Sequence, residues 1–405
     1  MPCRPVNLNG PRGPVVQWPR TPAFQAGNAG SNPVGTALPH LVGDSHWVSA
    51  VHESRVGGAP GVCHLSVAST VSTMKPDAVT RSQVLGYRLR ANHLNRRLDR
   101  EDVDEAAYVG LQDSVPRSAL LSLHARVEDV DFDAWSDPNL VQVWGPRGSV
   151  YVIPKSDFAV FTMGRLPRNA DQRRAIEEDA RRMRDLLDIS DGPALETVTG
   201  GSVRRAREAA ATGTIRIRWD GSRIEVWAAE PPDVDVEACR LELARRYLRA
   251  LAPSHSPHFA SWAGIEPEEA TGTWKALQDE LVDVRVGGTT RQALAEFAGS
   301  LFGDDETPDT TRLLAPGDPY LLARDREAAV PDELHRSQLW PQGNVPPGAL
   351  LVQGELAGTW RRRLHSFTIT PWQLISAEDK NAVQADVRAM PSLGASEPSV
   401  RWIST

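Results

Sequence analysis

The pattern of hydrophobic and polar positions changes at residue 74. Residues 1–73 are rich in Gly, Pro, Ser, Val and Ala, and they show no sustained strand-like or helix-like period. Such a segment buries too little apolar surface to offset the entropy lost on ordering, so we expect residues 1–73 to be disordered. The run Gly30-Ser31-Asn32-Pro33 also corresponds to the codons of a transfer-RNA T-arm. We hypothesise from this run that translation begins at Met74.

The segment from residue 74 to residue 168 shows three helical patterns followed by two β-like runs. The helices are expected to begin near Thr80, Asp104 and Pro116. Thr80 is a good N-cap, and Gln83 completes a capping box with it. The runs Leu140–Trp144 and Ser149–Ile153 are joined by Gly-Pro-Arg-Gly, which is typical of a hairpin turn. Three helices and a hairpin in this order predict a winged helix over residues 74–168.

A similar order of elements is expected twice more. In residues 169–232, two helices lead into a hairpin, with expected ranges Ala170–Leu187, Val203–Ala211, Thr214–Trp219 and Arg223–Ala228. In residues 233–300, a long helix and a tight helix pair lead into a strand, with expected ranges Val236–Leu251, His258–Gly264, Glu266–Glu280 and Leu281–Val286. These patterns predict a second and a third winged helix in tandem with the first.

Short strands dominate the pattern from about Leu313 onward. The expected strands are Tyr320–Leu322, Ala349–Gly354, Leu356–Trp360 and Ser366–Thr370. Their spacing predicts a small β-rich module over residues 301–390, and we expect residues 391–405 to be a frayed tail. The predicted fold class is therefore α+β, with three tandem winged-helix modules, a C-terminal β-rich module and a disordered N-terminal extension.

Composition places the chain among globular proteins. It has 405 residues, of which 40% are apolar and 24% are charged, close to the average for such proteins. No apolar run approaches the ~18–20 residues of a membrane span, and no secretory signal is visible at the N-terminus. The three cysteines lie far apart and form no CxxC pair, which excludes a disulfide framework. We expect a cytoplasmic protein that does not contact membranes.

Arginine is the most informative residue type in the chain. The 45 basic residues include only four lysines, which indicates either a GC-rich genome or recognition of phosphate and guanine by arginine. The net charge of −7 means that any DNA-binding face must come from segregated arginines. The arginine-rich helix within residues 165–184 also fits a solvated face crossed by ion pairs. Motifs for phosphate loops, dinucleotide binding, serine hydrolases and zinc proteases are absent from the sequence.

Several stretches together resemble a known family. Residues 109–117 read Val-Gly-Leu-Gln-Asp-Ser-Val-Pro-Arg, and residues 140–148 read Leu-Val-Gln-Val-Trp-Gly-Pro-Arg-Gly. Residues 154–158 read Pro-Lys-Ser-Asp-Phe, and residues 314–320 read Leu-Ala-Pro-Gly-Asp-Pro-Tyr. In order and spacing, these stretches are similar to the AlkZ/YcaQ-like DNA glycosylases of bacteria, over about residues 78–390.

The resemblance implies a function and a partner. It implies three winged helices that form a concave surface for double-stranded DNA, with a β-rich module beside them. The implied reaction is hydrolysis of the N-glycosidic bond of alkylated purines, with bulky adducts or crosslinks as substrates of some members. Neither a metal nor an organic cofactor is implied, and we expect a nucleoid-associated monomer.

The family's catalytic motif is Gln–aliphatic–Gln or Gln–aliphatic–Asp before the third helix. By resemblance, Gln112 is expected to position the water, with Asp113 and Ser114 as partners that depart from the motif. Either Asp113 takes over by a local shift or activity is weak or absent, because Ser is shorter than Gln and lacks the charge of Asp. Gln112 also fits a polar residue that bonds to the backbone at a helix–turn junction. Arginines expected to contact DNA are Arg117, Arg147, Arg165, Arg168, Arg204, Arg205, Arg361 and Arg362.

Two other functional classes stay open at this point. One is a non-catalytic winged-helix protein, such as a transcriptional regulator or a damage sensor that uses the same surface. The other is a scaffold whose arginines only solvate its helices. Salt-dependent binding to duplex DNA separates the scaffold from the rest, and release of an alkylated base separates the enzyme from the sensor.

Overall fold

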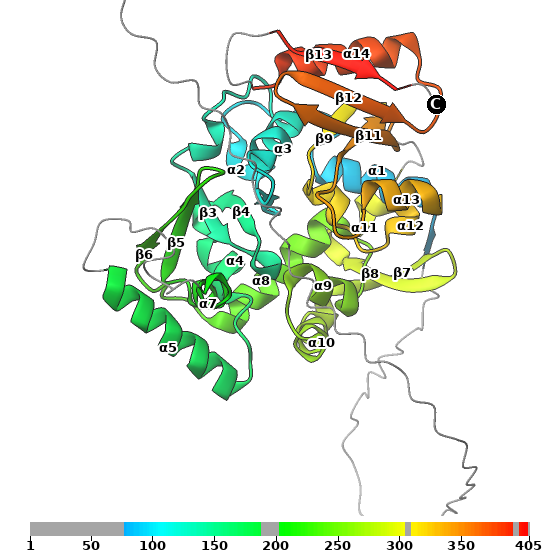
Figure 1. Cartoon of the computed structure of the whole chain (residues 1–405). Coiled ribbons are helices and arrows are strands. Elements are labelled where there is room, and N and C mark those ends of the chain that lie inside the picture. The colour runs from blue at the N-terminus through cyan, green and yellow to red at the C-terminus, as the bar shows by residue number, and fades with distance from the viewer. Residues whose placement is uncertain (1–76, 188–201, 304–308, 392–396, 404–405) are drawn as a thin grey trace, which may run out of the picture. The chain divides into compact units, whose positions relative to one another are not determined.

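The structure is a computed structural model, and it describes residues 77–187, 202–303, 309–391 and 397–403 (Figure 1). The expected disorder of residues 1–73 and the hypothesis about Met74 lie outside these residues. The α+β class is confirmed, because helices and three sheets make up the described chain. Within the same residues, no helix is long and apolar enough to cross a membrane.

The first part of the chain follows the expected order of elements. Its helices and strands are β1 (Asp77–Val79), α1 (Arg81–Ala91), α2 (Val103–Ala106), β2 (Leu111–Gln112), α3 (Ser118–Arg126), β3 (Leu140–Trp144) and β4 (Val150–Pro154). The capping box is confirmed, because the backbone N–H of Gln83 donates to Thr80 Oγ1 (3.1 Å) and that of Thr80 donates to Gln83 Oε1 (2.9 Å). The short strand β2 was not expected.

The middle of the chain also matches its expected elements closely. It contains α4 (Phe158–Met163), α5 (Ala170–Leu187), α7 (Val203–Ala209), β5 (Ile215–Trp219), β6 (Ile224–Ala228), α8 (Val236–Leu251), α9 (Ser256–Ala263), α10 (Pro267–Ala276), β7 (Leu281–Val286), β8 (Thr289–Leu294) and α11 (Ala295–Leu301). Strands β5 and β6 pair from Ile215–Ala228 to Trp219–Ile224, as the turn at Asp220-Gly221 requires.

The last part contains more helix than expected. Its elements are β9 (Arg312–Leu314), α12 (Arg326–Ala329), α13 (Glu333–Leu339), β10 (Gly348–Val352), β11 (Glu355–Arg363), β12 (Ser366–Pro371), α14 (Ala377–Ala389) and β13 (Ser399–Trp402). The expected strand at Tyr320–Leu322 is wrong: Pro319–Leu322 form a 3-10 turn, because Pro319 starts it and Asp318 caps it. The expected frayed tail is wrong for Ser399–Trp402, which pair in parallel with β12.

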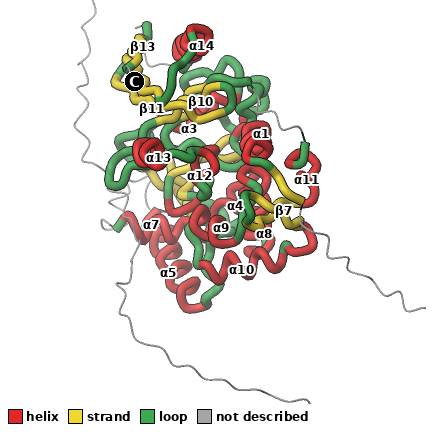
Figure 2. Tube along the Cα trace, turned by 90° about the vertical axis from the view of Figure 1, so that its right-hand side faces the viewer, coloured by secondary structure: helices red, strands yellow, loops and turns green. Residues whose placement is uncertain are grey.

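The sheets join segments that the sequence places in different modules. The five-stranded sheet β2-β4-β3-β5-β6 combines the hairpins of the first two expected winged helices. Strand β1, at the start of the described chain, pairs in parallel with β7 of the third. The sheet β13-β12-β11-β10-β9 packs against α14, which lies beside it in both views (Figures 1 and 2). The division into three winged helices therefore stays a prediction.

The largest hydrophobic core also crosses the expected boundaries. Val143 and Tyr151 of the first hairpin pack with an aromatic cluster from α8, α9 and α10. Within that cluster, the ring of Tyr247 lies 5.5 Å from Phe259 and 5.2 Å from Trp262. Because these contacts are buried, the first hairpin is fixed to the third group of helices, and this places β2 and its polar residue Gln112.

Candidate active site

Gln112 is held by three hydrogen bonds at the end of the short strand β2. Its Oε1 accepts from a guanidinium N–H of Arg147 (2.9 Å), and its Nε2 donates to Ser114 Oγ (3.1 Å). Its backbone carbonyl accepts from Ser118 Oγ at the start of α3 (2.8 Å). The carboxamide is thus oriented, with one oxygen lone pair and one N–H left for a ligand. Gln112 lies on a strand, and not at a helix–turn junction, which was the alternative interpretation of this residue.

Ser114 is exposed and forms the outer end of this arrangement. Its hydroxyl oxygen accepts from Gln112 Nε2, so its own O–H is available to donate to water or to DNA. Ser114 therefore shares the site with Gln112, as the sequence predicts. It carries no charge, and so it contributes a hydrogen bond and not a carboxylate.

Asp113 lies on the opposite side of the strand from Gln112 and is fully buried. Successive residues of a strand point to opposite faces, so Asp113 faces the interior. Its carboxylate accepts from the backbone N–H of Ala119 (3.0 Å) and from Gln142 Nε2 (3.0 Å). Burial raises the pKa of Asp113 to about 7, although these hydrogen bonds act in the opposite direction. The suggestion that Asp113 replaces a catalytic partner of Gln112 is not supported by this geometry, because its carboxylate holds the start of α3.

A loop from the C-terminal part of the chain packs against Gln112. Gly317 in this loop has φ +77°, and a Cβ there would lie 3.4 Å from Gln112 Cδ. The next residue, Asp318, is buried and accepts two hydrogen bonds from the guanidinium of Arg126 on α3 (2.7 and 2.8 Å). Ser122 adds a third bond to the same carboxylate (2.9 Å). This buried ion pair fixes the Gly317 loop beside Gln112.

Arg147 approaches Gln112 from the turn between β3 and β4. It has φ 57°, and its second guanidinium N–H donates to the carbonyl of Trp262 (3.3 Å). At the end of α9, a Cβ on Gly264 would lie 2.8 Å from Arg147 Cα, so only glycine fits there. The end of α9 therefore holds the arginine that orients Gln112.

Arg324 and Arg326 complete a group of arginines with Arg147, which we call the Arg147 cluster. Burial and repulsion from Arg147 and Arg326 lower the pKa of Arg324 to about 10, and burial and Arg147 lower that of Arg326. Neither forms an ion pair with a described carboxylate, nor does Arg147. Between them, Asp325 instead pairs with Arg88 (2.8 Å). The Arg147 cluster is a site of positive charge suited to phosphate.

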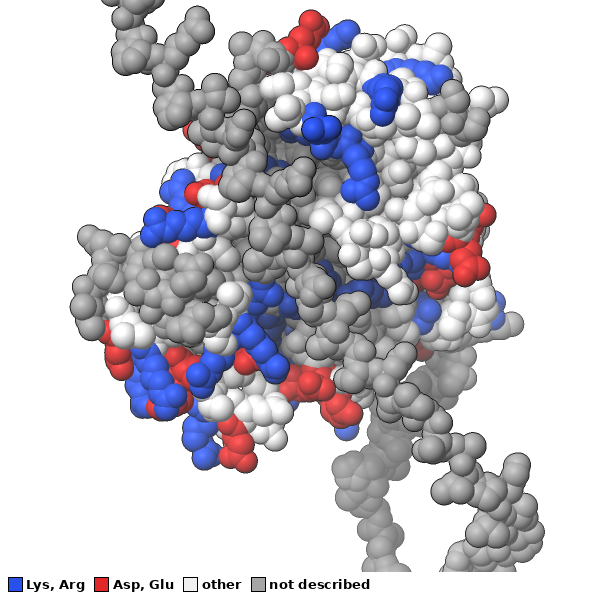
Figure 3. All heavy atoms as spheres, in the orientation of Figure 1, with Lys and Arg blue, Asp and Glu red and all other residues white. Residues whose placement is uncertain are grey.

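The distribution of charged side chains over the surface differs between two regions. Figure 3 shows Lys and Arg side chains in a central hollow of the face that it displays, partly behind residues that are not described. On the side of α5, basic and acidic side chains alternate instead. Arg324 and Arg326 were not predicted as site residues, because nothing in the local sequence pattern near residue 325 links them to Gln112.

The other predicted DNA contacts fall into two groups. Arg117 and Arg165 are partly buried and bond to backbone carbonyls: Arg117 to Trp219 (3.4 Å) and Arg165 to Trp144 (2.7 Å). Burial lowers the pKa of Arg165 to about 10. Arg117 also lies 3.7 Å from the ring centre of Trp135. Both side chains brace the protein through these bonds.

The remaining predicted contacts are exposed. Arg168 pairs with Glu237, Arg204 with Glu208 (2.8 Å), and Arg205 with Asp179 (3.1 Å). These exposed pairs fit the solvated-face interpretation. Arg361 and Arg362 lie on β11 and donate to the carbonyls of Val345 (3.0 Å) and Leu364 (2.7 Å), without a described carboxylate partner. Among the described residues, no group of three His, Cys, Asp or Glu could hold a metal ion.

Comparison with known proteins identifies the class. The sequence profile of the family described as DNA glycosylase AlkZ-like matches residues 103–227 and 194–392. The chain therefore belongs to the AlkZ-like DNA glycosylase family. A similar solved structure is that of Streptomyces sahachiroi DNA glycosylase AlkZ, with a TM-score of 0.67 and 18% sequence identity, covering 80% of this chain and 100% of that chain. This likeness shows the fold. No curated protein matches the sequence.

Proposed function

We propose that this protein is a DNA glycosylase that hydrolyses the N-glycosidic bond of N7-alkylated purines, including bulky or crosslinked ones, in double-stranded DNA. The observation that carries the proposal is the oriented carboxamide of Gln112 between Arg147 and Ser114. Membership of the AlkZ-like family supports the same function. The Arg147 cluster supplies positive charge beside that carboxamide for the DNA backbone.

The chemistry requires little from the protein beyond positioning. An N7-alkylated purine is already cationic, so the bond between C1′ and N9 breaks with both electrons going to the base, and no strong acid is needed. The oxygen of water then adds to C1′, and its proton leaves to solvent. The free lone pair of Gln112 Oε1 would orient that water or stabilise the positive sugar, and the Ser114 hydroxyl would hold the water from the other side.

We further propose that the hairpins β3–β4, β5–β6 and β7–β8 are the wings of three winged-helix units that hold the duplex. Arg147, Arg324 and Arg326 would contact phosphates near the lesion, and Arg361 and Arg362 would contact them from the β-rich module. The protein would work as a monomer at the nucleoid.

A second candidate function is a damage sensor without catalysis. It is favoured by one observation: Asp113 is buried against α3 and Ser114 is neutral, so neither of the two residues that follow Gln112 places a carboxylate beside its carboxamide. A sensor would use the same Arg147 cluster to bind alkylated DNA. It would release no base.

Base release from methylated duplex DNA tests the proposal. Free 7-methylguanine is measured by chromatography above the spontaneous rate, for the wild type, Gln112→Ala and the control Gln384→Ala, whose residue is exposed on α14. We expect release by the wild type and the control, with a loss of about 100-fold or more in Gln112→Ala and unchanged DNA binding. Equal release by the wild type and Gln112→Ala would contradict the proposal, and binding without release would identify a sensor.

A further inference from the structure

An open groove lies between strands β3 and β5, away from the hydrogen bonds that orient Gln112. The two strands pair at a single position, Gln142 opposite Ile217, so their remaining edges separate. The cavity between them has a volume of about 300 Å³, at the lower end of the range for sites that hold a small molecule. It is large enough for one nucleoside unit.

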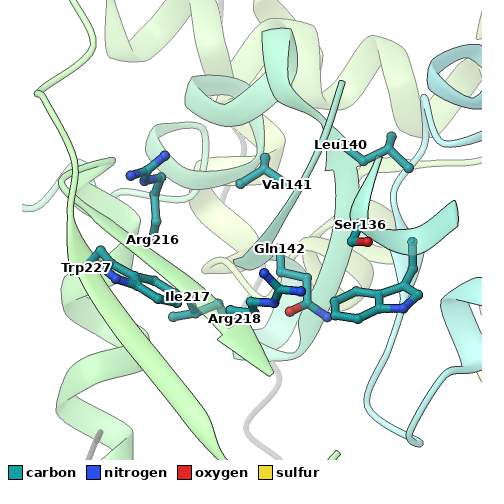
Figure 4. A pocket seen from close by; sticks show the side chains of 9 residues that line it. Ser136, Leu140, Val141, Gln142, Arg216, Ile217, Arg218 and Trp227 are labelled. Atoms are coloured by element: carbon teal, nitrogen blue, oxygen red, sulfur yellow. The ribbon is translucent and has the colours of Figure 1, made fainter. Parts of the chain in front are cut away.

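The lining of the groove combines arginine with tryptophan. Figure 4 shows Trp227 and Arg216 on the side of the β5–β6 hairpin, and Leu140 and Ser136 on the other side. Arg216 lies opposite Trp227 in the hairpin register, so the two side chains share one face of the sheet. Trp227 is partly exposed and Arg216 is exposed, so both are accessible from solvent.

Among the described residues, no carboxylate forms an ion pair with the arginines of the groove. Neither Arg216 nor Arg218 forms an ion pair with a described carboxylate, and no described Asp or Glu lines this cavity. Glu225 lies opposite Arg218 but pairs with Arg223 at 3.8 Å. The guanidinium of Arg218 lies 5.2 Å from the ring centre of Trp135, which holds it at the groove.

The adjoining cavity extends the positive charge. It shares Arg216 with the groove and adds Lys155 at the end of β4, and its one described acidic residue is Glu230, beyond Ala228. A partly exposed indole next to guanidinium groups that have no described carboxylate partner is the combination by which proteins bind single strands, since every base can stack and every nucleotide carries a phosphate. An acidic peptide would use the arginines but would gain little from the indole.

We propose that this groove binds an unpaired segment of DNA, with a base stacked on Trp227 and the flanking phosphates on Arg216 and Arg218. The site goes beyond the proposed base release. It does not need Gln112, and it acts on undamaged DNA.

Fluorescence anisotropy with two labelled probes tests the groove. One probe is a blunt duplex, and the other is the same duplex with a single-stranded thymidine tail. For Arg216→Ala combined with Arg218→Ala, and for Trp227→Ala, we expect the affinity for the tailed probe to fall about tenfold, with the blunt probe unaffected. Trp227→Phe should retain part of the stacking. Arg204→Ala, on α7 and paired with Glu208, should bind both probes like the wild type.

Three results would overturn the proposal. The first is equal binding of the tailed probe by the wild type and the double arginine variant. The second is an equal loss for both probes, which would make the groove an ordinary duplex contact. The third is competition by polyglutamate that matches competition by oligothymidylate. If Trp227→Ala unfolds, the double variant at the exposed positions Arg216 and Arg218 decides the outcome.

Discussion

Helices α5 and α7 and the surroundings of Gln112 are both rich in arginine, but their arginines have different partners. On the helices, exposed arginines pair with carboxylates one turn away, as Arg182 does with Glu178 (2.9 Å) and Arg204 with Glu208 (2.8 Å). Around Gln112, Asp318 and Asp325 form ion pairs with other arginines, Arg126 and Arg88. The Arg147 cluster is therefore left without ion pairs among the described residues.

This difference shows that the density of arginine along a chain does not reveal which guanidinium groups are available to DNA. Availability depends on the nearest carboxylate in space. Asp318 and Asp325 both lie close in sequence to Arg324 and Arg326 of the cluster. However, Asp318 forms its ion pair with Arg126, and Asp325 forms its ion pair with Arg88. Both aspartates fix loops at the site without neutralising it.

Breaking the buried ion pair should have the largest effect. In Asp318→Asn, Arg126 keeps a buried charge without a full counter-charge, and we expect the free energy of unfolding to fall by about 3–5 kcal/mol. Urea unfolding measures this loss, with the exposed Asp279→Asn as control. If Asp318→Asn lowers the free energy of unfolding no more than the control does, the buried pair contributes as little to stability as the exposed pairs of α5 and α7.

Removing Arg147 should affect the reaction more than the fold. Arg147→Ala deprives Gln112 Oε1 of its donor, and we expect the rate of base release to fall about 10- to 100-fold. Single-turnover rates at saturating protein separate this effect from weaker binding. Arg204→Ala serves as the matched control on α7. An unchanged rate in Arg147→Ala would show that the orientation of Gln112 does not matter.

The buried Asp113 should make stability depend on pH. Burial raises its pKa to about 7, so between about pH 4 and pH 7 the folded state holds a proton that the unfolded state has lost. Stability therefore falls as the pH rises through this window, by up to about 1.4 kcal/mol per pH unit. Asp113→Asn should lack this decline. Parallel pH profiles of the free energy of unfolding for the two proteins would contradict the assignment.

The exposed pairs on α7 should matter least. Arg204 is 88% exposed in its side chain, and exposed ion pairs of this kind contribute little to stability. We expect Arg204→Ala to unfold at nearly the same urea concentration as the wild type and to bind duplex DNA equally well. A clear loss of DNA affinity in this variant would show that ion-paired arginines also serve as contacts.

Local signals in the sequence predicted much of the secondary structure. The capping box at Thr80 and the turn at Asp220-Gly221 are confirmed, because each depends on residues a few positions apart. The sequence also indicated Arg147 as a functional residue, and the structure brings it to Gln112. The direction of Asp113 was missed because Leu111–Gln112 were not expected to form a strand, and strand alternation decides which side chain is buried.

The rest of the site depends on contacts between distant segments. Gly317 and Arg324 lie about two hundred positions after Gln112, and no periodicity connects them. The parallel pairing of β13 with β12 likewise depends on a neighbour that local propensity does not reveal. The fold class was therefore predictable from the sequence, whereas the group of side chains around Gln112 was not.

The salt dependence of duplex binding tests most directly whether DNA lies on the Arg147 cluster. Binding constants are measured over a range of salt concentrations for the wild type, for Arg147, Arg324 and Arg326 replaced together by Ala, and for Arg204 and Arg205 replaced together by Ala. In the wild type, the logarithm of the binding constant should fall linearly with the logarithm of the salt concentration. We expect this negative slope to become smaller in magnitude by about two to three in the first variant and to stay unchanged in the second. A slope that changes only in the second variant would contradict the account.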